Sequence, residues 1–146
     1  MALVDLLLRQ ARTRPDVGAI FHGTQPHATH AQWAARSAGL AARLRAEGLV
    51  PGDCVLLFMH NHPRYLEALW GAWWAGLVVV PVNAKLHPRE VEWIAANCGA
   101  RWTFVTSDVA PEPLARIERQ IDQRTFLLAG VSHDLRTISI YKGLQY

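Results

Sequence analysis

The sequence predicts an α/β fold: an incomplete layered sheet of parallel type with flanking helices, followed by a carboxy-terminal helix. Two observations carry this prediction. Segments with helical spacing of apolar residues alternate with short apolar runs that suit buried strands, and the connections between them are short. The 146 residues, 51% hydrophobic and 18% charged, have the composition of a globular domain rather than of a disordered chain.

Four segments have the periodicity and the end signals of helices. Thr29 suits an N-cap because its side-chain oxygen can accept a hydrogen bond from the first turn, and glycines suit the carboxyl ends. The predicted helices are residues 3–12, the stretch that follows Thr29 and stops at Gly48, a stretch that starts near Pro63, and the stretch from His87–Pro88 to Gly99.

Four short apolar runs are predicted to be strands. The run CVLLFM is apolar on both faces, which is typical of a central strand in a parallel sheet. Polar residues follow three of the runs, and they would gather at the carboxyl edge of the sheet, where ligands of open α/β sheets usually bind. The predicted strands are residues 18–23, 54–59, 77–82 and 101–107.

Charge and hydropathy exclude several classes of protein. The formal net charge is only +3, which argues against a strongly basic nucleic-acid binder. The longest apolar stretch, residues 68–82, contains two glycines and a proline and is shorter than the roughly 20 residues that cross a bilayer. The amino-terminal run LVDLLL precedes its arginines, which is the reverse of a secretory signal. We therefore expect a cytoplasmic protein, with Cys54 and Cys98 as buried thiols.

The residues alone indicate no catalytic, nucleotide or metal site. Seven histidines are present, but none falls into HExxH or a Cys/His zinc pattern, so we expect no metal. The glycines form neither GxGxxG nor a P-loop, so no phosphate cradle is predicted. Lys85 follows a predicted strand and could meet an anion, although a solvated loop lysine is the simpler interpretation. The tryptophans at 70, 73 and 74 are interpreted as core residues.

The character of the chain changes after Pro113. The charged stretch from Ala115 onward lacks buried β-branched runs, and it is predicted to be one helix with apolar residues at 117, 121, 128 and 131. We accordingly divide the chain into residues 1–112 and a helical tail, 113–146. Within the tail, SHDLRT places His133 beside Asp134, a carboxylate that could hold the imidazole in a nucleophilic tautomer.

Residues 1 to about 110 resemble the amino-terminal part of the AMP-binding acyl-CoA ligases, the acyl-adenylate-forming superfamily. The most specific stretch is WWAGLVVVPVNAKLHPREVEWI, residues 73–94, which resembles the AG-x-VVP-N motif and the helix that follows it. The resemblance implies that a carboxylic acid, a fatty or malonyl-type acid by the character of the match, attacks ATP to give acyl-AMP, and that coenzyme A then displaces AMP. ATP, magnesium and coenzyme A are the cofactors that it implies.

The same resemblance implies that the catalytic motifs lie elsewhere. The phosphate-binding loop with its lysine, the adenine-, magnesium- and ribose-binding residues and the mobile carboxy-terminal domain of the family have no counterpart in these 146 residues. No catalytic or cofactor-binding residue is therefore carried over. We expect a truncated ligase fragment that is inactive alone.

Residues 116–137 resemble the phosphoacceptor helix of a sensor histidine kinase, with His133 at the position of the phosphorylated histidine and Asp134 as the neighbouring acid. Two partial families in one chain predict a chimeric or frameshifted reading frame. Two alternatives to the ligase fragment thus stay open: a phosphoacceptor and dimerisation fragment of a two-component kinase, or a non-catalytic α/β interaction domain.

Overall fold

The computed structural model describes residues 2–106, 127–131 and 138–142. The chain divides into two compact units. The first contains the residues up to Gly52 together with Asn61–Val78, and the second contains Asp53–His60 together with the described residues from Val79 onward. None of the helices in the described ranges has the length and hydropathy of a bilayer-spanning segment.

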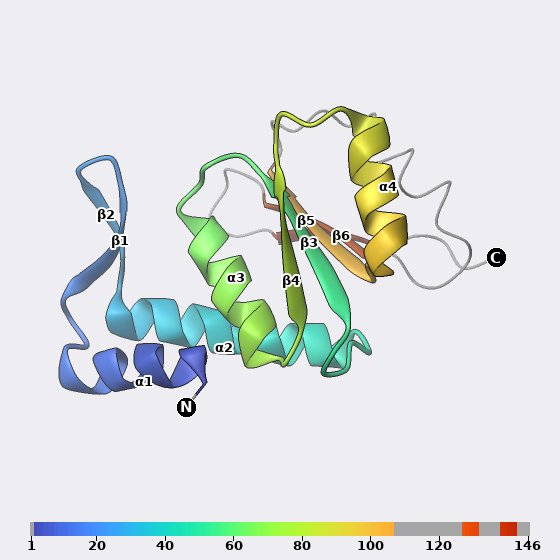
Figure 1. Ribbon diagram of the computed structural model, residues 1–146. Helices are drawn as coiled ribbons and strands as arrows, with labels where there is room; N and C mark the ends of the chain where they lie inside the picture. The colour runs from blue at the N-terminus through green and yellow to red at the C-terminus, as the bar shows by residue number, and fades with distance from the viewer. Residues whose placement is uncertain (1, 107–126, 132–137, 143–146) are drawn as a thin grey trace. The chain divides into compact units, whose positions relative to one another are not determined.

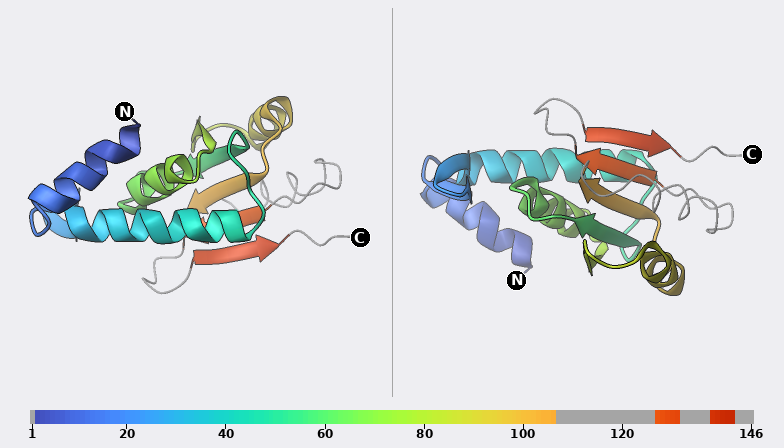
Figure 2. Two further views of the ribbon diagram at one scale, coloured as in Figure 1. Left: turned by 90° about the horizontal axis from the view of Figure 1, so that it is seen from below. Right: turned by 90° about the horizontal axis from the view of Figure 1, so that it is seen from above.

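The first unit is built from three helices and a hairpin (Figure 1). Its helix α2 packs against both α1 and α3, and α1 lies alongside α2 in Figure 2 as well. The elements are α1 (Leu3–Thr13), β1 (Gly18–His22), β2 (Gln25–Thr29), α2 (His30–Ala46) and α3 (Arg64–Trp74).

The hairpin is the main element of this unit that the sequence analysis missed. Strand β1 was predicted, but its antiparallel partner β2 was not, because Pro26 and the polar residues around it do not resemble a strand. A two-residue connection, Gly23–Thr24, joins the strands, and Gly23 has φ 60°. A two-residue turn with glycine is a strong hairpin signal, and a two-stranded sheet consists only of edges, where proline is tolerated.

In the residues that the structure describes, the second unit contains a sheet and the helix α4. The five-stranded sheet has the order β4-β3-β5-β6-β7, and β3 pairs with β5 in parallel. The predicted α/β class with a sheet of parallel type is confirmed. The elements are β3 (Cys54–Met59), β4 (Val78–Asn83), α4 (Pro88–Cys98), β5 (Trp102–Thr106), β6 (Leu127–Val131) and β7 (Ile138–Lys142).

The core of this unit lies between α4 and the sheet. Side chains of β3, β4 and β5 join those of α4 in one apolar cluster, formed by Leu56, Phe58, Val82, Val91, Ala95, Ala100 and Val105. The prediction that CVLLFM is a central strand is confirmed, because β3 lies between β4 and β5 and residues 55–59 are all buried.

The predicted carboxy-terminal helix is wrong where the structure describes it. Residues 127–131 form β6, which pairs in parallel with β5, and residues 138–142 form β7, antiparallel to β6. The two arrows point in opposite directions in the right-hand view of Figure 2. The apolar spacing of 117, 121, 128 and 131 suited a helix, but the run LLAGV is also an apolar strand pattern, and pairing with β5 satisfies its backbone groups.

The contact between α2 and α3 depends on a glycine. A Cβ atom at Gly71 would lie 2.7 Å from Leu40 Cδ2 and 3.0 Å from Leu40 Cβ. The distance to Leu40 Cβ matters more, because the backbone of α2 fixes the position of that atom, so it cannot rotate away. Gly71 therefore sets how closely the two helices approach.

We predict that Gly71→Ala lowers the free energy of unfolding by about 1–2 kcal/mol, because overpacking outweighs the gain in helix propensity. The matched control is Gly39→Ala in α2, where an added Cβ meets nothing within 4 Å. That change should raise the free energy of unfolding by up to about 1 kcal/mol. Urea unfolding of both variants measures the difference, and stabilisation by both would contradict the close approach.

Candidate functional site

The carboxyl edge of the sheet carries polar residues, as predicted. Because β3 and β5 are parallel, with Val55 opposite Trp102 and Phe58 opposite Val105, their carboxyl ends lie at the same edge. His60 follows β3 and is half-buried, and Asn83 ends the neighbouring strand β4 and is exposed. Parallel sheets bind ligands at this edge, so it is the candidate site of the second unit.

The loop that leaves β4 is fixed by its own hydrogen bonds. The backbone N–H of Lys85 donates to Asn83 Oδ1 at 2.9 Å, and the N–H of Leu86 donates to the carbonyl of Asn83 at 3.0 Å. Asn83 thus closes a tight turn with its side chain and its backbone. Lys85 is exposed at the tip of this turn. A preformed loop that presents an ammonium group can meet an anionic ligand without ordering itself first.

The end of the same loop is fixed by a cap. His87 Nδ1 accepts a hydrogen bond from the N–H of Arg89 at 3.3 Å, and Glu90 Oε2 accepts from the N–H of His87 at 2.8 Å. This reciprocal arrangement is a capping box at the start of α4, where Pro88 occupies the first turn. The imidazole of His87 is therefore a structural acceptor.

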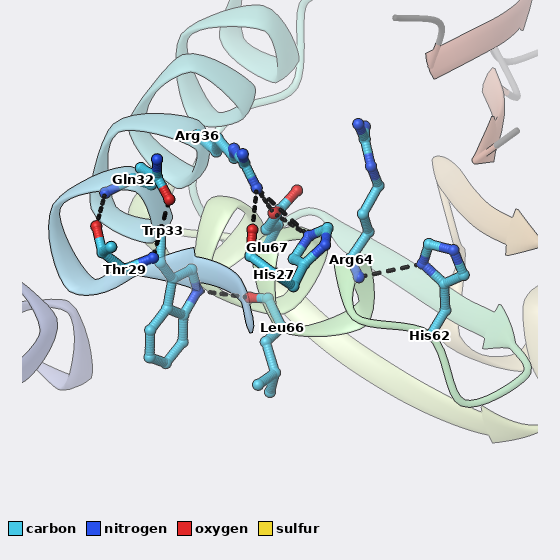
Figure 3. Close-up of polar contacts among 9 residues, drawn as sticks. All are labelled: His27, Thr29, Gln32, Trp33, Arg36, His62, Arg64, Leu66 and Glu67. Atoms are coloured by element: carbon cyan, nitrogen blue, oxygen red, sulfur yellow. Dashed lines mark hydrogen bonds and ion pairs between the residues drawn. The ribbon is translucent and has the colours of Figure 1, made fainter. Parts of the chain in front are cut away.

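A buried carboxylate in the first unit was missed by the sequence analysis. Glu67 lies on α3 with its side chain only 9% exposed. Its Oε1 accepts from Arg36 Nη1 at 2.9 Å and lies 2.9 Å from His27 Nε2 (Figure 3). These residues come from α3, α2 and β2, so the cluster ties three elements together. Its only sequence signal was a single acid in the otherwise apolar stretch YLEALWGAWWAG.

The surroundings of this cluster indicate a structural role. Trp33 Nε1 donates to the carbonyl of Leu66 at 3.3 Å, next to Glu67 (Figure 3). The predicted N-cap Thr29 is confirmed: its Oγ1 accepts from the N–H of Gln32, whose Oε1 accepts from the N–H of Thr29. Figure 3 shows that the polar groups of this region face one another. The cluster holds the hairpin against α2 and α3.

Two of the described histidines have structural contacts. His27 contacts Glu67, and His87 caps α4. His62 Nδ1 accepts from the N–H of Arg64, as Figure 3 shows. Among the residues that the structure describes, no three His, Cys, Asp or Glu side chains converge as metal ligands would. His133 and Asp134 lie outside the described residues.

Comparison with known proteins identifies the family. The sequence model of the family described as "AMP-binding enzyme" matches residues 7–139, which is most of the chain. The chain belongs to the AMP-binding enzyme family. The predicted resemblance to AMP-binding ligases is thereby confirmed, and the match includes strands β3 to β6 and the loop between β4 and α4.

Individual relatives agree with the family. A feruloyl-CoA synthase from an Amycolatopsis species is 42% identical over 93 residues, which cover 64% of this chain and 19% of the synthase. A long-chain-fatty-acid–CoA ligase from Mycobacterium tuberculosis is 32% identical over 113 residues, 76% of this chain and 22% of the ligase. The chain thus spans about a fifth of the length of these relatives.

Solved structures show the same fold. A benzoate CoA ligase from Burkholderia xenovorans superposes with a TM-score of 0.80 at 22% identity, over 90% of this chain and 26% of the ligase. The amino-terminal domain of a second protein, described as FACL13 from Mycobacterium tuberculosis, gives a TM-score of 0.76 at 29% identity, over 90% of this chain and 34% of that domain. The fold is that of the amino-terminal domain of adenylate-forming ligases.

The resemblance to a histidine kinase gains no support. The AMP-binding match continues to residue 139 and so includes residues 116–137, for which the phosphoacceptor helix was expected. Part of that expected helix is strand β6. The expected junction near residue 113 also falls inside the match, so the chimeric interpretation is unsupported.

We predict that Glu67→Gln lowers the free energy of unfolding by about 1–3 kcal/mol, because Arg36 and His27 lose a buried charged acceptor. The matched control is Glu47→Gln. It removes the surface ion pair between Arg43, on α2, and Glu47, the residue that follows the last residue of α2. An exposed pair of this kind contributes about 0.5 kcal/mol. Equal losses in urea unfolding would contradict the structural role of the buried cluster.

Proposed function

We propose that this chain forms the amino-terminal part of a ligase that activates a carboxylic acid with ATP and transfers the acyl group to coenzyme A. Membership of the AMP-binding enzyme family is the observation that carries the proposal. The relatives that support it are named as CoA synthases and CoA ligases. In the reaction, a carboxylate oxygen attacks the α-phosphorus of ATP and pyrophosphate leaves. The thiol of coenzyme A then attacks the acyl carbon and AMP leaves.

The described residues fit one wall of such a site rather than its catalytic centre. The carboxyl edge offers Asn83, Lys85 and His60, whereas magnesium bound to phosphates needs carboxylate ligands, and no acidic cluster occurs in the described ranges. No catalytic step is therefore assigned to these side chains. The residues from β4 to α4 supply a rigid loop and one exposed ammonium group at the edge.

The acid that we propose has a large apolar body. Fatty acids are the first class to test, because a relative is named for long-chain fatty acids, and aromatic acids are the second, because another is named for feruloyl-CoA. We also propose that the reaction takes place in the cytoplasm, where ATP and coenzyme A are available. We also propose that the 146 residues alone do not adenylate an acid, since they match only about a fifth of those relatives.

Two preparations test the function. The first is the polypeptide from the longest reading frame of the source gene that contains these residues, and the second is the 146-residue chain. We predict ATP–pyrophosphate exchange that depends on added fatty or aromatic acid in the first preparation, and exchange at the level of a buffer blank in the second. Exchange by the 146-residue chain would contradict its proposed inactivity. A folded longer polypeptide that exchanges with no acid of the panel would contradict the ligase assignment.

Single substitutions in and next to the loop after β4 test the role of individual residues in the longer polypeptide. If the ammonium group of Lys85 faces an anionic substrate, Lys85→Ala should raise a substrate KM by about ten-fold, the effect of losing one charge-assisted hydrogen bond. Arg89→Ala is the matched control, because Arg89 is an exposed cation on the first turn of α4. Equal KM values for the two variants would contradict the role of Lys85.

A further inference from the structure

The two cysteines of the chain approach each other within the second unit. Cys54 is the first residue of β3, and Cys98 is the last residue of α4. Side chains two residues apart on a strand share a face, so Cys54 continues the row formed by Leu56 and Phe58. Both of these lie in the apolar cluster under α4.

The helix brings its own cysteine to the same interface. Residues three, four and seven apart on a helix share a face, so Cys98 continues the stripe of Val91 and Ala95, which belong to the same cluster. Cys98 packs against that cluster, and its thiol lies 3.6 Å from the carbonyl of Ala95. Cys54, at the start of the row on β3, and Cys98, at the end of the stripe on α4, therefore lie at the same end of the interface between strand and helix.

Backbone contacts hold the two ends in register. Gly99 ends α4 in the left-handed conformation, with φ 61°, and turns the chain toward β5. Three residues after Cys98, the N–H of Arg101 donates to the carbonyl of Cys54 at 2.9 Å. The guanidinium of Arg101 also pairs with Asp53, the residue before Cys54. Both cysteines thus lie beside anchored backbone.

The two thiols are close enough to influence each other. Burial raises the pKa of the Cys98 thiol, and the nearby Cys54 side chain raises it further. Each residue is half-buried, so an oxidant can reach the pair from solvent. Both thiols were expected from the sequence to be buried, and each residue is only partly buried.

We propose that Cys54 and Cys98 are an oxidisable dithiol that closes to an intramolecular disulfide in the folded protein when it meets a peroxide or glutathione disulfide. With hydrogen peroxide, one thiol gives up its proton and its sulfur attacks oxygen, the O–O bond breaks, and the leaving hydroxide takes up that proton, so that a sulfenic acid and water form. The second thiol gives up its proton and its sulfur attacks the sulfenic sulfur, the S–S bond forms, and the S–O bond breaks with the leaving hydroxide taking up the proton as a second water. Two electrons pass from the sulfurs to the peroxide. With glutathione disulfide, two exchange steps release two glutathione thiols.

The test treats the folded chain with glutathione disulfide and follows its products by intact mass and trypsin digestion. We expect loss of two hydrogens and a linked pair of peptides, residues 46–64 with residues 90–101, each of which contains one cysteine. The same reaction in urea provides the comparison. The disulfide should be favoured in the folded chain over the unfolded chain by about ten-fold or more in equilibrium constant, because folding holds the thiols together.

A variant with the thiol moved provides the matched control. Cys98→Ser combined with Ala96→Cys shifts the thiol two residues along α4 to an exposed position. This variant should form mixed disulfides with glutathione when folded, and it should behave as the native chain does in urea. Circular dichroism verifies that it folds.

Two results would overturn the proposal. One is that the folded native chain yields mixed disulfides or disulfide-linked dimers in place of the linked peptides. The other is that folding gives no advantage over the chain in urea. The comparison of folded and unfolded native chain needs no variant, so it stands even if the double variant fails to fold.

Discussion

The parallel pairing of β3 with β5 is the constraint on which the second unit depends. Parallel neighbours cannot be joined by a short turn, so the chain must return to the same edge of the sheet before β5 begins. Between the two strands the chain passes through α3, β4 and α4. It covers the sheet with α4 and brings the carboxyl ends of β3 and β5 to one edge and their amino ends to the other.

This arrangement separates two kinds of chemistry. The carboxyl edge has the polar turn at Asn83 and the exposed Lys85, which are suited to a ligand. Cys54 opens β3 and Cys98 lies shortly before β5, so the dithiol lies at the amino edge. Oxidation at the amino edge would join α4 to β3 without altering a side chain at the carboxyl edge. The strand direction alone therefore keeps the redox pair away from the candidate ligand site.

Short sequence patterns predicted those helices and strands that are specified by interactions between residues close together in the sequence. CVLLFM is apolar on both faces, Thr29 has a capping oxygen, and Gly99 has the freedom to end a helix, so β3, α2 and α4 follow from short stretches of sequence. The candidate edge was predictable for the same reason, because polar residues directly follow the apolar runs.

The missed features depend on partners far along the chain. Leu127–Val131 is compatible with a helix or a strand, and its pairing with β5 decides between them. Glu67 on α3 is an ordinary acid until the fold brings Arg36 and His27 to it from other elements. Long-range pairing of this kind has no signature in a window of ten or fifteen residues.

The contacts of the described cations support the proposal that these residues position a ligand rather than stabilise charge. Adenylation needs positive charge near the α-phosphate that is free to meet it. Four arginines are instead engaged within the protein: Arg36 with Glu67, Arg43 with Glu47, Arg101 with Asp53, and Arg45 with the carbonyl of Trp74. These contacts stabilise the helices, the hairpin and the start of β3. Lys85 and Arg89 are exposed cations in the segment from β4 to the first turn of α4. The proposed function therefore assigns this edge the positioning of a ligand, and it assigns the stabilisation of charge to other residues.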